Sequence, residues 1–214
     1  MRILITAGPT YEPIDSVRFI GNRSSGKMGY AVAEAARQRG AEVVLVSGPT
    51  ALPDPMGVSV IRVQTAQQML EAVSEHFDAC EVFIATAAVA DYRPETSMPS
   101  KRKRQTRAWT VRLVPNPDIL GTVAQRKAHR ILVGFAAETD KVLEHARQKL
   151  QRKHLDLLAV NDVLEPGSGF EVDTNRLTLL YADGRIEALP QMSKQACAEV
   201  LMARVVDLYR AKAL

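Results

Sequence analysis

The stretch GNRSSGKMG, residues 21–29, carries the residue types of a phosphate-binding loop at almost the required spacing. Gly21, Gly26 and Lys27 satisfy the pattern G-x-x-x-x-G-K-[ST], but Met28 stands where a hydroxyl side chain belongs. That hydroxyl binds Mg²⁺ in a P-loop enzyme, and a thioether is a poor ligand for a hard cation. The stretch is therefore a damaged P-loop, a coincidence, or a different device for an anionic ligand.

The surroundings of this stretch disfavour a P-loop. A P-loop directly follows its strand, whereas about fifteen residues separate the apolar run 2–6 from Gly21. Ser24, Ser25 and Gly26 precede an amphipathic segment, so the free N–H groups and the dipole of a helix start would face whatever binds there. An ordinary N-cap explains the same residues. Both interpretations stay open at this point.

A second chemical feature is the basic run KRKRQTR. Such a run is usually a solvated loop. The functional alternatives are a nucleic-acid patch and a clamp for a polyphosphate. A protein that binds single-stranded nucleic acid needs aromatic side chains beside the cations, on which bases stack. Only Trp109 is close to this run in the sequence. The cations are Lys101, Arg102, Lys103, Arg104 and Arg107.

The elements that must position these residues alternate between apolar β-branched runs and segments with helical periodicity. This alternation predicts βαβ units, a largely parallel sheet and right-handed crossovers. Asp183-Gly184 predicts a hairpin turn near the end of the chain. The expected strands are 2–6, 42–47, 58–63, 81–87, 109–114, 131–136, 155–160 and 177–181, and the expected helices are 28–39, 65–77, 116–127, 138–153 and 193–210.

Capping signals predict where several helices begin and end. Thr65 is the expected N-cap of the second helix, and Gly40 is the expected stop of the first. Pro117 falls in the first turn of the third helix, with Asp118 at the positive end of its dipole. In such a sheet, ligands bind outside the carboxyl ends of the strands. Small residues gather there, and Gly8 would let the backbone approach a ligand closely.

Length and composition set further limits. The 214 residues show no linker, repeat or shift of composition, so we predict a single domain over residues 1–214. No apolar run approaches the ~20 residues that span a bilayer, and the opening segment is typical of a strand rather than a signal peptide. Cys80 and Cys197 belong to no CxxC pattern, which disfavours a disulfide framework. We expect a cytoplasmic protein that binds neither membrane nor nucleic acid.

The motifs NRSSGKMG, AAVADYRP, KRKR, NPDIL and GFAAET occur in this order, followed by KLQRK and VND. Together they resemble bacterial phosphopantothenoylcysteine synthetase over essentially the whole chain. Each motif alone is weak, but five in register are specific. The resemblance implies an α/β, Rossmann-like three-layer domain with a mostly parallel mixed sheet and a late antiparallel strand in a hairpin extension.

The resemblance also implies a reaction. Enzymes of this family join 4′-phosphopantothenate to L-cysteine through an acyl-cytidylate formed from CTP, with release of pyrophosphate and with Mg²⁺ neutralising the triphosphate. Related forms accept ATP, so the choice of nucleotide stays open. The family is dimeric, with residues 169–175 and the following hairpin at the interface and a shared acyl site. A flavin-dependent decarboxylase is often fused in front, so a free-standing chain and an excised half both remain possible.

Site residues follow from the matching motifs. Asn22 would donate to the oxyanion that forms when cysteine attacks, and Lys101 would close over the triphosphate on a flexible flap. Arg104 replaces a family lysine, which leaves the role of that position open. Asp91 would hold Mg²⁺ or orient the ribose. Nucleotide contacts are expected from Gly8, Ser24, Ser25, Gly26, Ala85, Thr86, Ala87, Asp91, Lys101, Pro117, Asp118, Ile119, Leu120, Phe135, Lys149 and Lys153.

An NAD(P)-dependent oxidoreductase is the main alternative from another class. It would require a G-x-G-x-x-G fingerprint after the first strand and an acid at the end of the second, and the sequence has neither. The four histidines show no metal-ligand spacing, and no G-x-S-x-G elbow is present. The ligase is the function that we predict.

Overall fold

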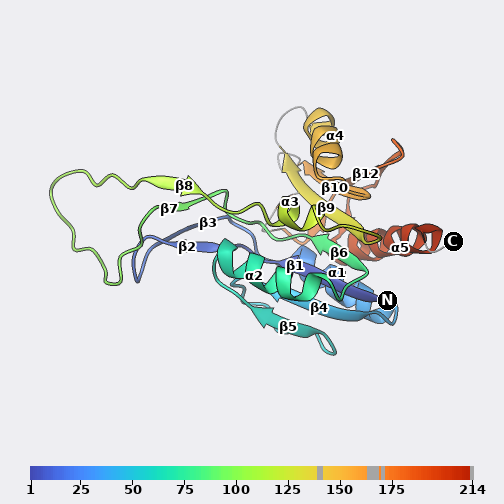
Figure 1. Ribbon diagram of the computed structural model, residues 1–214, viewed down its shortest axis with the longest axis horizontal. Helices are drawn as coiled ribbons and strands as arrows, with labels where there is room; N and C mark the ends of the chain where they lie inside the picture. Colours follow the sequence, from blue (N-terminus) through green and yellow to red (C-terminus); the bar gives the residue numbers. More distant parts are fainter. Residues whose placement is uncertain (139–141, 163–168, 170–171, 213–214) are drawn as a thin grey trace.

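A computed structural model describes residues 1–138, 142–162, 169 and 172–212. Its centre is an eight-stranded sheet in the order β13-β12-β10-β9-β6-β1-β4-β5 (Figure 1). The strands are β1 (Arg2–Ala7), β4 (Glu42–Ser47), β5 (Ser59–Arg62), β6 (Val82–Ala85), β9 (Ile131–Glu138), β10 (Leu157–Asp162), β12 (Leu177–Tyr181) and β13 (Ile186–Ala188).

The direction of these strands confirms the predicted fold class. The six strands from β5 to β10 pair in parallel. β12 then runs antiparallel to β10, and β13 antiparallel to β12. The predicted hairpin is therefore present, with Gly184 at φ +90° in its turn, and it extends the main sheet. The sheet is mixed, with one strand running against the others.

Five helices cover the two faces of the sheet within the described residues. α1 (Lys27–Gln38) and α5 (Lys194–Lys212) pack on one face, against side chains such as Ile5. α2 (Ala66–Phe77), α3 (Ile119–Ala124) and α4 (Val142–Arg152) pack on the other, against side chains such as Leu4. Because neighbouring residues of a strand point to opposite faces, the apolar run of β1 serves both layers.

The helix boundaries confirm some capping signals and correct others. Thr65 caps α2 in a capping box with Gln68, and Gly40 follows α1 at φ +79°. The N-cap of α1 is Gly26 rather than a serine. Asp118 is the N-cap of α3, at the positive end of its dipole as expected, and Pro117 directly precedes it near the first turn. The Asp118 carboxylate accepts a hydrogen bond from the Gly121 amide at 2.9 Å, and the helix therefore begins at the next residue, Ile119.

Two antiparallel ribbons leave the sheet together and reach far from its body (Figure 1). One is β2 (Tyr11–Pro13) with β3 (Phe19–Gly21), and the other is β7 (Tyr92–Pro94) with β8 (Leu113–Pro115). The strand predicted at residues 109–114 is therefore wrong in extent and position. β7 offers only three partner residues, and Trp109 instead contacts the guanidinium groups of Arg18 and Arg102, which lie 5.0 and 4.7 Å from its ring centre.

Buried acids anchor the ribbons. The Glu12 side chain accepts from the Ala66 amide of α2 at 2.9 Å, in a residue that is only 1% exposed. Asp15 accepts from Arg18 and from the backbone amide of Arg102, and the hydrogen bond from Arg18 holds the pKa of this carboxyl well below its usual range. Glu12 therefore ties the first ribbon to α2, and Asp15 ties the turn of that ribbon to the loop between β7 and β8.

The remaining described elements are small. β11 (Thr174–Asn175) pairs with β14 (Met192–Ser193) beside the start of α5. Cys80 and Cys197 are both buried free thiols, and burial raises the pKa of each to about 11. Among the described residues, no helix is both long enough and apolar enough to cross a bilayer.

Candidate functional site

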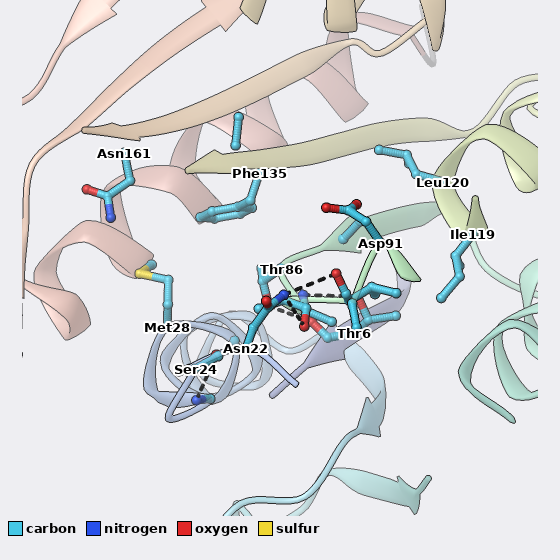
Figure 2. A pocket seen from close by; sticks show the side chains of 18 of the residues that line it. Thr6, Asn22, Ser24, Met28, Thr86, Asp91, Ile119, Leu120, Phe135 and Asn161 are labelled. Atoms are coloured by element: carbon cyan, nitrogen blue, oxygen red, sulfur yellow. Dashed lines mark hydrogen bonds between the residues drawn. The ribbon is translucent and has the colours of Figure 1, made fainter. Parts of the chain in front are cut away.

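The strand order creates a switch point between β1 and β6. From β1 the chain builds outward through β4 and β5 on one side, and then returns to add β6, β9 and β10 on the other. Loops therefore part at the carboxyl ends of β1 and β6, where open α/β sheets bind ligands. A cavity of about 500 Å³ lies there. Figure 2 shows Met28 and Asn161 on one side of it, Ile119 and Leu120 on the other, and Phe135 between them.

Most residues predicted for the site line this cavity, although they come from five separate segments. The amino end of α1, the loop after β6, the start of α3, strand β9 and one face of α4 all contribute. Lys149 and Lys153 therefore face the cavity rather than open solvent. The predicted residues that line it are Asn22, Ser24, Ser25, Gly26, Ala85, Thr86, Ala87, Asp91, Pro117, Asp118, Ile119, Leu120, Phe135, Lys149 and Lys153.

Two predicted residues, Gly8 and Lys101, are not among the described residues that line the cavity. Gly8 lies beneath the lining, since a Cβ on Gly26 would come within 3.4 Å of its Cα. Lys101 is exposed in the loop between β7 and β8, beside Arg18 and Trp109. The sequence placed it near the triphosphate, but the ribbon holds it away from its own cavity.

The amino end of α1 is open toward the cavity. Gly26 is its N-cap in the left-handed conformation, at φ +79°, and no described side chain caps it. The Ser24 hydroxyl accepts from the Gly26 amide at 3.3 Å, before the helix begins. The first turn has no acidic residue and contains Lys27. The first amides of α1 and the positive end of its dipole thus remain available to an anion.

Close packing brings this helix start to the strand ends. A Cβ on Gly29 would lie 2.4 Å from Thr86 Oγ1 and 2.5 Å from Ala7 Cβ. Only glycine fits at this point without a shift of α1. The absence of a side chain therefore lets the helix start reach the switch point.

Replacing Gly29 by alanine is expected to lower the free energy of unfolding by about 1–3 kcal/mol, because α1 must move off the sheet. The better helix propensity of alanine, about 1 kcal/mol, offsets part of this loss. Thermal melting measures the effect. The matched control is Gln38→Ala at the exposed end of the same helix, where a change within about 0.5 kcal/mol is expected. A melting temperature of Gly29→Ala equal to the wild type would refute the close contact.

Asn22 fastens the loop that follows β6. Its side-chain Nδ2 donates to the carbonyl oxygens of Ala88 and Val89, at 3.1 Å each. Both amide hydrogens are thereby used. The predicted donation from Asn22 to an oxyanion would require one of these bonds to break, whereas its Oδ1 remains an acceptor.

Further hydrogen bonds hold the same loop. Thr86 Oγ1 donates to the Thr6 carbonyl oxygen at 2.5 Å, and the Thr10 hydroxyl accepts from the Ala90 amide at 3.0 Å. Asn116 Nδ2 donates to the Ala90 carbonyl oxygen at 2.8 Å. The backbone of residues 85–91 is therefore held rigidly against the cavity, as a reader of a ligand edge requires.

The far end of the cavity is built by α3 and α4. Lys153 Nζ donates to Asp118 Oδ1 at 2.5 Å, and Lys149 Nζ donates to the Phe135 carbonyl oxygen at 2.8 Å. Burial acts to raise the pKa of Asp118, but hydrogen bonds from Lys153 and Gly121 outweigh it and the pKa lies below the usual value. Asp118 thus caps α3 with a negative charge. That residues 117–120 contact the nucleotide stays a prediction, and Asp118 places a carboxylate at this helix start.

Comparison with known proteins decides the family. Residues 1–209 match the family described as DNA/pantothenate metabolism flavoprotein C-terminal domain. The chain belongs to this family. The resemblance drawn from the sequence motifs is thereby confirmed.

Curated relatives of this family are close in sequence. The coenzyme A biosynthesis bifunctional protein CoaBC of Escherichia coli (strain K12) is 49% identical over 216 residues, which cover 99% of this chain and 53% of the relative. CoaBC of Bacillus subtilis (strain 168) is 50% identical over 193 residues, which cover 90% of this chain and 48% of the relative. The chain spans about half the length of the curated relatives that it matches.

A solved structure supports the same assignment. The crystal structure of the C-terminal domain of CoaBC superposes with a TM-score of 0.85 at 43% identity, covering 98% of this chain and 96% of that chain. This likeness confirms the α/β fold class.

A magnesium ion would find few protein ligands in this flavoprotein C-terminal domain. Among the described residues, no three His, Cys, Asp or Glu side chains are grouped to hold a metal. Asp91 and Asp118 line the cavity, and Asp118 is already paired with Lys153. Mg²⁺ usually keeps several waters and combines one or two carboxylates with substrate phosphates. The residues fit that mode of binding.

Sequence reasoning missed several residues of the cavity. Asn116 and Asn161 lay within the quoted motifs NPDIL and VND, but no role was predicted for them. Lys27 was noticed only as part of an incomplete P-loop. Asn175 and Lys194 follow no motif, and they reach the cavity only because β11 and α5 pack beside α1.

Met28, the residue that breaks the P-loop pattern, is half-buried and packs against the apolar cluster of α1 and α5. Its sulfur lies 3.9 Å from Asn175 Nδ2. We expect Met28→Ser to lower the free energy of unfolding by about 1–2 kcal/mol and to bring no gain in affinity for Mg·CTP. A melting curve and a nucleotide titration measure both effects. The matched control is Met56→Ser, at a residue 86% exposed. Tighter nucleotide binding by Met28→Ser would restore the P-loop interpretation.

Proposed function

We propose that the chain is a ligase that joins 4′-phosphopantothenate to L-cysteine, using CTP and releasing pyrophosphate. The family and the coenzyme A biosynthesis proteins that share it support this reaction. The observation that carries the proposal is one cavity lined by an open helix start, a rigid backbone loop and Asn22. These are the parts that a nucleotide and an acyl transfer require.

The polarity of the cavity suggests how the nucleotide lies. Phe135 and the backbone of Ala85, Thr86 and Ala87 offer an apolar surface and hydrogen-bonding groups to a base. The open end of α1 suits the phosphates. The Asp118 carboxylate at the start of α3 would repel the phosphates at that end of the cavity. It suits the hydroxyl groups of a ribose instead.

The reaction has two steps. A carboxylate oxygen of phosphopantothenate attacks the α-phosphorus of the nucleotide and pyrophosphate leaves. The amine of cysteine then attacks the acyl carbon, CMP leaves, and the amide forms. Mg²⁺, when bound, would neutralise part of the triphosphate charge, with Asp91 as its proposed protein ligand. Both steps concentrate negative charge, which amide donors and cations must balance.

For Asn22 the hydrogen bonds favour a modified role. Its Nδ2 keeps Ala88 and Val89 in place, and its Oδ1 accepts a hydrogen bond from the attacking amine. The side chain would thereby orient the nucleophile above a loop that it also fixes.

A homodimer is part of the proposal. Exposed apolar side chains gather on the two ribbons, at Val17, Phe19, Tyr92 and Leu113. Such a patch supports contact with a second copy. In that dimer Lys101 would serve the partner's cavity, because the ribbon holds it away from its own. In the interface segment expected from the sequence, residues 170–171 lie outside the described residues.

The alternatives have less support. After β1 the chain enters the β2–β3 hairpin instead of a glycine-rich turn into a helix, and β4 ends at Ser47, which is not an acid. Both features argue against a nicotinamide site. Two guanidinium groups already lie over the ring of Trp109, so it offers less stacking surface to nucleic acid. A decarboxylase, fused or separate, remains a proposed partner.

Pyrophosphate release tests the function. The protein is given phosphopantothenate and either CTP or ATP, with cysteine omitted. We expect a burst of about one pyrophosphate per site with CTP, and continued release only after cysteine is added. No release with either nucleotide would reject the ligase. Release with ATP alone would reject the choice of CTP.

A further inference from the structure

The end of the cavity between α1 and α5 contains a second group of charged side chains. Lys27 begins α1, and Lys194 begins α5, and both line the cavity. Asp173 lies beside them. Met28 and Asn161 mark this end in Figure 2. The sequence placed Asp173 only within the expected interface segment 169–175, and it assigned no role to Lys194.

Lys194 is an unusually buried lysine, with only 6% of its surface exposed. Its Nζ donates to the carbonyl oxygens of Gly169 and Val172, at 3.0 and 2.5 Å. Its backbone amide donates to the carbonyl oxygen of Asp173 at 2.9 Å. Burial lowers the pKa of Lys194, and the nearby Lys27 lowers it further. These bonds fix the backbone at Asp173 and at the residue before it.

Asp173 in turn holds Lys27. The distance from Lys27 Nζ to Asp173 Oδ1 is 2.5 Å, and the hydrogen bond lowers the pKa of Asp173. Both side chains are partly exposed, so this ion pair adds little to stability. Its effect is to set the position of the Lys27 ammonium at the mouth of the uncapped helix.

The charges of the two ends differ. At the α3 and α4 end, the carboxylates of Asp91 and Asp118 balance Lys149 and Lys153. At the α1 and α5 end, Lys27 lies close enough to Lys194 to lower its pKa, and the positive end of the α1 dipole adds to the charge of both lysines. The chemistry that this end fits is a phosphate chain.

We propose that Lys27 contacts the terminal diphosphate of the nucleotide, and that Asp173 and Lys194 are positioning residues that aim its ammonium there. The proposal rests on the proposed ligase function, because it names the part of that site which holds the leaving group. It extends that function to three residues outside the predicted set.

Titration of inorganic pyrophosphate into the full chain tests the proposal without any turnover. The variants are Lys27→Gln and Asp173→Ala, with Arg37→Gln as the control. Arg37 is an exposed cation at the other end of the same helix, about 15 Å away along its axis. Both Lys27→Gln and Asp173→Ala change partly exposed side chains, so melting temperatures should stay close to the wild type.

The sign of the Asp173→Ala effect is decisive. If Asp173 positions Lys27, its loss weakens pyrophosphate binding, by about threefold to tenfold. If it only adds negative charge, its loss removes a repulsion and tightens binding, which would overturn the proposal. Lys27→Gln should weaken binding by about tenfold to a hundredfold, the worth of a charge-assisted hydrogen bond, and Arg37→Gln should leave it unchanged.

Lys194→Met tests the remaining member of the group. Methionine keeps most of the volume and removes the ammonium, so a melting curve must first establish that the variant folds. Weaker pyrophosphate binding by a folded Lys194→Met protein supports the proposal, and unchanged binding contradicts the role of Lys194. The two proposals can fail separately. If the wild type releases pyrophosphate from CTP but Lys27→Gln binds pyrophosphate as tightly as the wild type, this inference is rejected and the proposed ligase function stands.

Discussion

Asn22→Asp is expected to slow overall amide formation about 10²–10³-fold while the burst of pyrophosphate from CTP persists. The substitution removes both donors that hold the carbonyl oxygens of Ala88 and Val89, and places a carboxylate against them. It also adds negative charge where the second step concentrates negative charge. The first step depends on the open end of α1 and on Lys27, which the substitution does not touch.

Two assays separate the steps for Asn22→Asp. Single-turnover release of pyrophosphate measures formation of the acyl-nucleotide, and release of CMP after cysteine is added measures its use. The side chain of Asn22 is exposed, so the melting temperature should change little. Full overall turnover by the variant would show that neither the fixed loop nor the amide oxygen matters. If the variant instead lost the burst of pyrophosphate, Asn22 would have its role in formation of the acyl-nucleotide, the first step.

Lys101→Gln is expected to reduce the rate of pyrophosphate release about 10²–10³-fold with no change in melting temperature. Lys101 is exposed in the loop between β7 and β8, so its removal leaves the core intact. A rate loss of this size requires the ammonium to reach a cavity that its own ribbon holds at a distance. The control is Arg112→Gln, an exposed cation at the base of the same loop, paired with Glu95.

Mixing tells which cavity Lys101 serves. If each ribbon completes the site of a second copy, equal amounts of the Asn22→Asp and Lys101→Gln chains should recover about a quarter of the wild-type rate. Half of the randomly paired dimers are mixed, and each of these has one intact site. A control must show that the two chains exchange partners in the mixture. If they do and no activity is recovered, Lys101 acts within its own chain.

Local signals in the sequence predicted most of the fold. The capping box at Thr65, the left-handed Gly40 and the turn at Gly184 depend on neighbours a few residues away, and all were predicted. The ribbons were not. Strands of three residues, such as β7 and β8, are too short to show the apolar-polar alternation of a strand. The position of Trp109 depends on Arg18, which is far away in the chain.

The site shows the same division. The motifs predicted residues such as Phe135 and Lys153, which line the cavity, because the carboxyl ends of parallel strands and the loops beside them meet at one edge. They missed Lys194, since only the packing of α5 beside α1 brings it there. They placed Asp118 correctly at the start of the third helix, because a helix cap depends on residues close in sequence.

The packing of α1 against α5 has a consequence for how the chain is made. Residues 27–38 are synthesised long before the helix that packs on them, residues 194–212. Until then the side of α1 that contacts α5 is uncovered, and the edge of β1 that pairs with β6 stays open until β6 has been made. Contacts so distant in sequence slow folding and expose a nascent chain to aggregation. Ribosome-bound chains that stop short of α5 should therefore depend on chaperones.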